Sequence, residues 1–314
     1  MRLIKSNTSI DFVALGRYAV IVSAVVLLAS IGSLLVGKLT FGIDFTGGVV
    51  VHVAYPQEVE LNDVRGALDD AGYTERTVQH FGSADTALIR LPAADGEKES
   101  AAIGDNVMAA LGAGPPGAAL QSVEFIGPQV GQNLVNKGGL ALLYTVIAIL
   151  IYVIVRFHWK LSAGAVAALV HDIVITLGVF SFTHMDFDLT VLAALLAVLG
   201  YSLNDTIVVY DRIRENFRRM RKATPKEVVN AAVNQTLSRT LMTSGTTILT
   251  LLALFFLGGP VIHGFAAALL VGIVTGTYSS IFVASALALL LNIDAHDLFP
   301  PKEEDAEKAA RVTR

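Results

Sequence analysis

Cysteine is absent from this sequence of 314 residues. Its absence removes disulfides, thiolate metal sites and cysteine nucleophiles from consideration, but it does not settle the compartment. Charged residues are scarce, at 16% of the chain, whereas hydrophobic residues make up 54% and the mean hydropathy is +0.61. A soluble globular protein of this size does not have such a composition. The sequence therefore predicts an integral membrane protein.

Catalytic motifs are missing as well. The chain contains no HExxH motif and no pair of membrane aspartates at matching depth, which are features expected of an intramembrane enzyme. We therefore expect no enzymatic activity, no metal and no cofactor.

Six apolar runs are each long enough to cross a bilayer, for which a helix needs roughly 20 residues. They cover approximately residues 18–36, 140–155, 161–182, 189–209, 240–257 and 262–291. A cleaved signal peptide is the alternative for the first run, because basic residues precede it. Its length and the lack of an A-x-A site before Gly37 favour an uncleaved span.

Lysine and arginine are absent from two connections between these runs, residues 183–188 and 258–260. They are concentrated before the first run, between the second and third, and in 211–239. Loops rich in Lys and Arg remain in the cytoplasm, so we expect both chain ends there. Residues 1–37 then form the cytoplasmic N-terminus with the first span, and residues 293–314 a cytoplasmic tail. This rule accounts for the basic residues in 211–239, so we do not assign them a role in binding a substrate.

Residues 38–137 differ from the rest in composition and should fold outside the membrane, in the periplasm. Strand-like stretches are expected at 48–55, 76–81, 86–91 and 121–126, and helices at 61–71 and 97–111. This order, β-α-β-β-α-β, is that of a ferredoxin-like α+β domain. Its exposed strand edges have two possible uses, binding an extended polypeptide or pairing with a partner domain.

Residues 138–292 should hold spans two to six, with an amphipathic cytoplasmic loop at 211–238. Within that loop, Thr224 and Glu227 form a capping box with Pro225 at the first helical position. We expect a short surface helix from 226 to about 237.

Two charges lie where lipid should exclude them, Asp205 in the fourth apolar run and Arg239 before the fifth. An unpaired charge at a helix centre costs roughly 2.5–3.5 kcal/mol on insertion scales, so such residues usually have a function. Tyr201 and Ser202 share the side of the helix that carries Asp205. The residues allow two interpretations, a fixed ion pair with Arg239 that orients helices and a proton switch. Arg239 has a further interpretation, snorkelling to the interface.

Polar residues also recur at helical spacing on the fifth run: Arg239, Thr243, Thr246, Thr247 and Thr250. The stripe indicates a hydrated or packed interior face; the alternative is that each hydroxyl bonds to its own backbone. His171 and Asp172 are adjacent and should point about 100° apart, so we assign them only secondary places in a polar network. Small residues on the sixth run, including Gly272, Gly276 and Ser280, predict close helix packing.

Three motifs in this order resemble the SecF family of bacterial protein-export subunits. They are FGIDFTGG at 41–48, GYSLNDTIVVYDRIREN at 200–216 and SRTLMTSGT at 238–246. The resemblance covers the whole chain. It implies one half of a resistance-nodulation-division type transporter, with SecD as the other half of a heterodimer in the inner membrane. An exporter that works alone would carry a second set of six spans.

The family resemblance also implies a mechanism and partners. SecD and SecF are held to use the proton-motive force to assist late preprotein translocation through SecYEG, and YajC and YidC complete the expected partners. No nucleic acid is expected to bind. A structural scaffold subunit without a proton-coupling role is the alternative function.

Residue by residue, the family motifs place proton coupling on Asp205 and Arg239, while the other proton-site aspartate belongs to SecD. The expected supporting polar network comprises Tyr201, Ser202, Asn204, Thr243, Thr246, Thr247, His171 and Asp172. The expected hinge to the external domain comprises Gly42, Asp44, Gly47 and Gly48. Protonation of Asp205 would loosen its pairing with Arg239 and move that domain.

Overall fold

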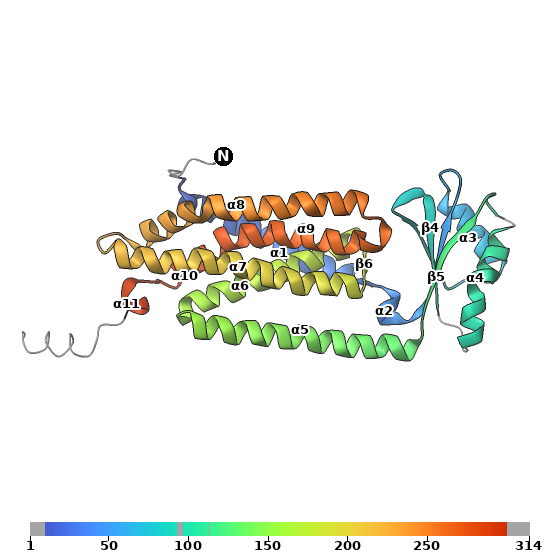
Figure 1. Cartoon of the computed structure of the whole chain (residues 1–314), viewed down its shortest axis with the longest axis horizontal. Helices are drawn as coiled ribbons and strands as arrows, with labels where there is room; N and C mark the ends of the chain where they lie inside the picture. The colour runs from blue at the N-terminus through green and yellow to red at the C-terminus, as the bar shows by residue number, and fades with distance from the viewer. Residues whose placement is uncertain (1–9, 93–96, 113, 300–314) are drawn as a thin grey trace, which may run out of the picture.

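The computed structural model describes residues 10–92, 97–112 and 114–299. Within that part, a long helical bundle carries a smaller α/β domain at one end (Figure 1). The start of helix α1 (Phe12–Val36) and the short helix α11 (Ala295–Leu298) both lie at the opposite end of the bundle (Figure 1). The terminal residues 1–9 and 300–314, including most of the predicted tail, lie outside the described residues.

Among the described residues, six helices are long and apolar enough to cross a membrane, which confirms the predicted number of spans. Besides α1, the bundle contains α5 (Pro128–Arg156), α6 (Trp159–Thr183), α7 (Leu189–Arg219), α8 (Pro225–Leu257), α9 (Pro260–Ile281) and α10 (Val283–Leu290). Helices α9 and α10 together form the sixth span. Helix α5 begins twelve residues before the apolar run at 140, because the helix continues out of the bundle toward the α/β domain (Figure 1).

The loop expected between the fourth and fifth spans is shorter than predicted. Helix α7 continues to Arg219 and α8 begins at Pro225, so the predicted surface helix is the first part of α8. The capping box of Thr224 and Glu227 is present, with Pro225 in the first turn. The predicted helix start is thus confirmed, and the predicted break before residue 240 is wrong because apolar side chains of this segment, Val228 and Val229 among them, pack into the bundle core.

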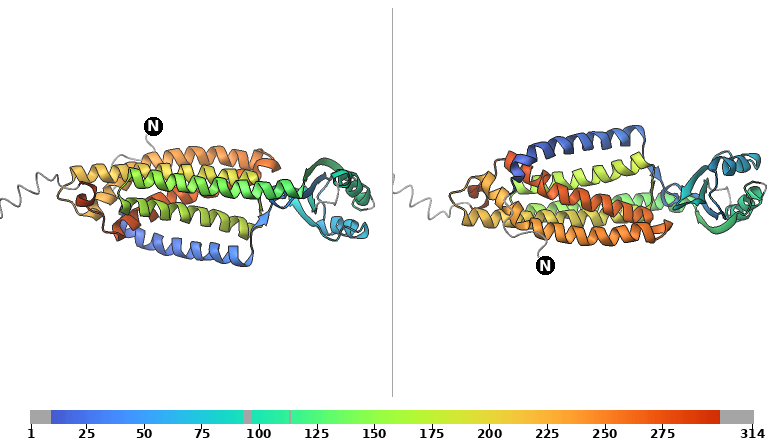
Figure 2. Two further views of the ribbon diagram at one scale, coloured as in Figure 1. Left: turned by 90° about the horizontal axis from the view of Figure 1, so that it is seen from below. Right: turned by 90° about the horizontal axis from the view of Figure 1, so that it is seen from above.

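Helices α6, α7 and α9 form the buried centre of the bundle, whereas α1, α5 and α8 expose most of their surface. The start of α1 contacts α8, where the Phe12 nitrogen donates to Asn230, but beyond that contact the two helices lie on opposite flanks (Figure 2). Small residues permit the central contacts: a Cβ on Gly276 of α9 would lie 2.9 Å from the Cβ of Ser202 on α7. This confirms the predicted packing role of the small residues on the sixth span.

The α/β domain has the predicted ferredoxin-like order of elements. Its four-stranded antiparallel sheet runs β3-β4-β2-β5, with β2 (Gly48–Ala54), β3 (Thr77–Phe81), β4 (Ser83–Leu91) and β5 (Ala119–Ile126). Helices α3 (Leu61–Asp70) and α4 (Glu97–Leu111) supply Val64, Leu68 and Val107 to a core shared with Val49, Val51 and Val53 of β2.

A short joint connects this domain to the bundle. Strand β1 (Thr40–Phe41) pairs in parallel with β6 (Asp186–Phe187), which lies between α6 and α7. Helix α2 (Ile43–Thr46) follows β1 and leads into β2. Arg90 of β4 donates to Asp186 at 2.6 Å, so an ion pair from the sheet reinforces the joint.

Candidate functional site

Asp205 lies in the interior of the bundle, on α7. Only 4% of the residue is exposed. One carboxylate oxygen, Oδ2, accepts a hydrogen bond from the Ser244 hydroxyl of α8 at 3.4 Å. Tyr201, one turn earlier on α7, donates its hydroxyl to Ser244 Oγ at 3.4 Å, as the shared helix side predicts.

Ser244 is the residue on which three helices converge. Besides its contacts with α7, it accepts a hydrogen bond from Thr277 of α9 at 2.7 Å. We call Asp205, Tyr201, Ser244 and Thr277 the Ser244 cluster. Because these bonds join Ser244 of α8 to both α7 and α9, a change in the charge of Asp205 acts directly on the place where the three helices meet.

A second polar cluster is centred on Asp172 of α6, which is fully buried. Its Oδ2 accepts hydrogen bonds from Ser202 of α7 at 2.5 Å and from Ser279 of α9 at 2.8 Å. Its Oδ1 lies 3.0 Å from Nδ1 of His171. We call these four residues the Asp172 cluster.

The expectation that the side chains of His171 and Asp172 point apart is wrong. Adjacent helical positions differ by about 100°, yet both side chains extend to the same side and meet. Asp172 is the more buried of the two membrane aspartates and has more hydrogen-bond partners than Asp205.

Arg239 does not form the expected ion pair. Within the described part of the chain, no ion pair connects Arg239 to Asp205 or to any other carboxylate. Arg239 is exposed. The polar stripe that continues from Arg239 also faces outward: Thr243, Thr246 and Thr250 are exposed, and Thr247 is half-buried. Their hydroxyls donate to carbonyls of their own helix, which is the alternative interpretation of the stripe.

Asn204 also falls outside the expected network. It is exposed on α7, between the buried residues Leu203 and Asp205. Together with Arg239 and the threonines it gives α7 and α8 an outward polar surface, which we call the outer polar surface (Asn204, Arg239, Thr243, Thr246 and Thr250). In this chain that surface is separate from the buried clusters.

Sequence reasoning did not place Ser244, Thr277 or Ser279 in the polar network. One signal was available for Ser244. The buried positions of this part of α8 include Leu237, Thr240, Ser244 and Leu251, which recur at helical spacing. This buried stripe carries fewer polar residues than the exposed stripe that begins at Arg239. The number of polar residues therefore indicated the wrong face of α8 as the interior one.

The expected hinge residues lie at the joint and are closely packed. Asp44 Oδ2 accepts from the backbone nitrogen of Leu189, at the start of α7, at 2.9 Å. Gly47 and Gly48 have φ values of +70° and +129°, which favour glycine, and a Cβ on Gly48 would lie 2.6 Å from the carbonyl oxygen of Leu91. The Gly42 nitrogen donates to the Phe187 carbonyl at 2.9 Å.

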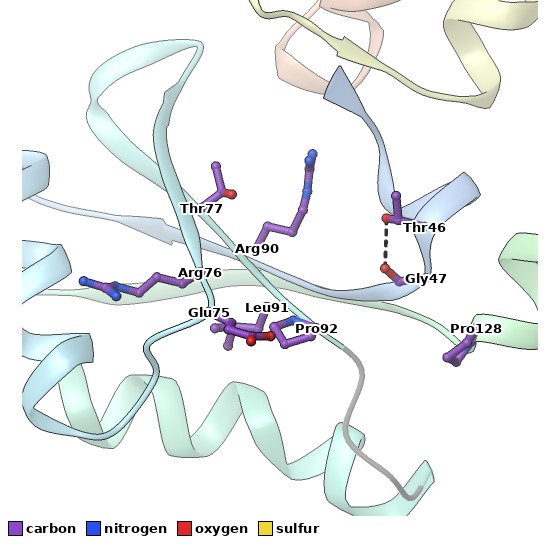
Figure 3. Close-up of a pocket in the computed structure, with 9 residues that line it drawn as sticks. All are labelled: Thr46, Gly47, Glu75, Arg76, Thr77, Arg90, Leu91, Pro92 and Pro128. Atoms are coloured by element: carbon purple, nitrogen blue, oxygen red, sulfur yellow. Dashed lines mark hydrogen bonds between the residues drawn. The ribbon is translucent and has the colours of Figure 1, made fainter. Parts of the chain in front are cut away.

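Two cavities lie at the end of the bundle that carries the α/β domain, away from both clusters. One, of about 380 Å³, is bordered by Glu75, Arg76 and Arg90 and by the Thr46–Gly47 turn (Figure 3). The other, of about 500 Å³, lies between the α/β domain and the joint, where Asp44 and Asp186 border it. Among the described residues there is no group of three or more His, Cys, Asp or Glu that could hold a metal ion.

Comparison with known proteins decides the family. The model "Protein export membrane protein SecD/SecF, C-terminal" matches residues 109–294, and "SecD/SecF GG Motif" matches 32–55. The protein translocase subunit SecF of Vibrio alginolyticus is 50% identical over 304 residues, which are 96% of each chain. This chain belongs to the SecF family.

Other SecF proteins and a solved SecDF structure agree. SecF of Pseudomonas aeruginosa is 46% identical over 95% of this chain and 96% of its own length. The crystal structure of SecDF, a translocon-associated membrane protein from Thermus thermophilus, matches with a TM-score of 0.83 and 35% identity. The match covers 92% of this chain and 40% of the solved chain. This chain thus spans less than half of that SecDF chain.

Proposed function

We propose that this SecF chain assists protein export together with SecD. In this proposal it uses the proton-motive force to help preproteins complete their passage through SecYEG. The chain lies in the inner membrane with both termini in the cytoplasm and residues 38–137 in the periplasm. The observation that carries the proposal is a buried carboxylate, Asp205, placed where three spans meet and beside a polar surface that the chain itself leaves uncovered.

The outer polar surface fits a second membrane subunit. Arginine and asparagine facing lipid at membrane depth are costly, so such residues usually face protein or a hydrated cavity. The match to 40% of a SecDF chain supports SecD as the partner that covers this surface. Arg239 would then meet a group from SecD, which explains why it has no carboxylate partner among the described residues of this chain.

Protonation of Asp205 has a local structural consequence. The ionised carboxylate only accepts hydrogen bonds, whereas the protonated group also donates one. Ser244 donates to Oδ2 of the carboxylate and accepts from Thr277 and Tyr201, so a proton bound to Oδ2 conflicts with this arrangement. Binding of a proton to this oxygen therefore rearranges the Ser244 cluster. Loss of an ion pair with Arg239 is not required.

Helix α7 connects this cluster to the α/β domain. Its first backbone nitrogen bonds to Asp44, which lies in α2 next to the joint. A displacement of α7 along its axis thus acts on α2 and on the β1–β6 pair. One proton crossing about 100 mV supplies about 2.3 kcal/mol, enough to bias a two-state rearrangement more than tenfold.

The test is the release of a stalled preprotein from membranes containing SecD and this chain, with and without a proton gradient. We expect the gradient to accelerate release for the wild type but not for Asp205→Asn. Asp211→Asn is the matched control, because Asp211 is on the same helix but pairs with Arg156 outside the cluster. If Asp205→Asn responds to the gradient like the wild type, the chain is a structural scaffold and the proton path lies elsewhere.

The partner surface has a separate test. Because the chain contains no cysteine, single cysteines can be introduced without removing native ones. We expect Thr246→Cys on the outer polar surface to cross-link to cysteines placed in SecD. Leu28→Cys, exposed on the opposite flank in α1, is the control and should not cross-link. The reverse pattern would place SecD on α1.

A further inference from the structure

The Asp172 cluster contains an imidazole nitrogen that the proposed function leaves unused. His171 is 3% exposed, and its Nδ1 faces Asp172. Its other nitrogen, Nε2, is buried and has no hydrogen-bond partner among the described residues. The ring stacks on Tyr278 of α9, with ring centroids 6.1 Å apart and planes inclined by 21°. The contacts therefore fix the ring and leave one nitrogen able to accept a proton.

The hydrogen bonds to Asp172 match an ionised carboxylate. Ser202, Ser279 and His171 surround its two oxygens, and all three can donate. A fully buried carboxylate costs several kcal/mol unless a cation compensates its charge. Within the described chain, the only ion pair that Asp172 forms is with His171. The cluster is therefore electrically compensated when the imidazole is protonated.

Other titratable groups near the pair are few. From α9, Tyr278 stacks on the ring and donates its hydroxyl to the Ala19 carbonyl of α1. From α7, Asp205 lies three residues beyond Ser202, about 4.5 Å along the helix axis. Helix α1 contributes Ser23, which donates to Tyr278; α10 has no titratable residue, and the tyrosines of α5, Tyr144 and Tyr152, are exposed.

We propose that His171 and Asp172 form a second proton-binding site in this chain. A proton from the aqueous phase binds the lone pair of Nε2, and Nδ1–H of the resulting imidazolium remains bonded to the Asp172 carboxylate. Release of the proton from Nε2 restores the neutral ring and leaves one uncompensated negative charge among α6, α7 and α9. Because Ser202 and Ser279 bond the same oxygen, this change of charge acts on the contacts between the three central helices.

The two sites share two helices. Helix α7 supplies Ser202 to Asp172 and carries Asp205, while α9 supplies Ser279 to Asp172 and Thr277 to the Ser244 cluster. A shift of either helix affects both carboxylates. This inference rests on the proposed use of a proton gradient, to which it adds a second proton-binding residue.

The test uses two substitutions that separate proton binding from packing. In His171→Asn the amide nitrogen takes the place of Nδ1 and can still donate to Asp172, but nothing replaces Nε2. In His171→Gln the amide takes the place of Nε2 and cannot accept a proton. Should one variant fail to fold, the other carries the test. His263→Asn is the control, because His263 lies in the first turn of α9 and contacts the Phe255 carbonyl.

Infrared difference spectra after a pH change would be recorded on the complex with SecD, with isotope-labelled histidine. We expect an imidazole band that is present in the wild type, His263→Asn and Asp205→Asn and absent from the His171 variants. We also expect gradient-dependent preprotein release to fall in those variants to the rate without a gradient. An unchanged imidazole band, or His171→Asn with wild-type gradient response, overturns the second site.

The outcome distinguishes the two proposals. If only Asp205→Asn abolishes the gradient response, the proposed function stands and His171 and Asp172 only pack the helices. If neither Asp205→Asn nor the His171 variants abolish it, the proposed function fails as well.

Discussion

At the scale of single residues, burial imposes different requirements on the charged groups of this chain. Asp172 and Asp205 accept hydrogen bonds from hydroxyls of neighbouring helices. Arg90 and Asp186 compensate each other directly at the joint. A hydroxyl partner leaves the charge of a buried carboxylate uncompensated, whereas an ion pair compensates it directly.

His52 in the external sheet makes the stability of that domain depend on pH. Burial lowers the pKa of His52, and the charge of Glu124 opposes this in part. The unfolded histidine has a pKa of about 6.5, so below that pH the unfolded state binds more protons and the free energy of unfolding falls. We expect hydrogen exchange of β2 to accelerate as the pH falls from about 7 to 5, after correction for intrinsic rates. This acceleration should disappear in His52→Asn and persist in His80→Asn, because His80 is exposed.

Gly276 allows α7 and α9 to approach closely. A Cβ there would meet Ser202, so Gly276→Ala should overpack the centre and lower the free energy of unfolding by about 1–3 kcal/mol. Gly245→Ala on α8 is the control, because a Cβ there meets nothing within 4 Å and alanine favours a helix. Thermal unfolding of the detergent-solubilised chain measures both. Equal effects would mean that the close approach is unimportant.

At the scale of elements, α7 is held at both ends and carries the candidate site between them. Asp188 caps its start by accepting from Val191, and Asp44 accepts from Leu189. Near its far end, Asp211 pairs with Arg156 of α5. Contacts at both ends of a helix disfavour local unfolding of its termini.

The hydrogen bond that Asp44 accepts from Leu189 should matter more for coupling between α7 and the α/β domain than for folding. Asp44→Asn removes a negative charge from the N-terminal end of α7, where such charges contribute about 0.3–1 kcal/mol. We expect only a small loss of stability but a reduced effect of the proton gradient on preprotein release. The control is Asp63→Asn, in the first turn of α3 in the external domain. Wild-type coupling in Asp44→Asn would exclude this route.

The start of α8 gives a purely structural prediction. Thr224→Ala removes the hydroxyl that accepts from the Glu227 nitrogen, so the free energy of unfolding should fall by about 0.5–2 kcal/mol. Thr224→Ser keeps the hydroxyl, so its free energy of unfolding should fall much less. Thermal unfolding and hydrogen exchange of the first turn of α8 measure the effect, which should be absent from the preprotein-release assay.

At the scale of the whole molecule, the ion pair of Arg90 and Asp186 limits how the external domain moves on the bundle. Asp186 also accepts from Gln79 at 3.2 Å, and Arg90 donates to the Phe41 carbonyl at 3.1 Å. We expect Asp186→Asn to broaden the distance distribution between spin labels on β4 and on the first turn of α9. Asp211→Asn at the other end of the bundle should leave it unchanged. An unbroadened distribution in Asp186→Asn would show that the β1–β6 pair alone holds the joint.

The sequence by itself determined six spans, the order of elements in the external domain and the start of α8. These features are local, because each depends on the length of an apolar run, a strand or helix period, or a capping pair within four residues. Apart from the small residues of the sixth span and the side of α7 that carries Asp205, the buried faces of the spans were decided only by the tertiary structure. A span is apolar all round, so its hydrophobic pattern does not mark the side that packs. The contact of His171 with Asp172, the junction at Ser244 and the outward side of Arg239 depend on how α6, α7, α8 and α9 pack together, which no single segment specifies.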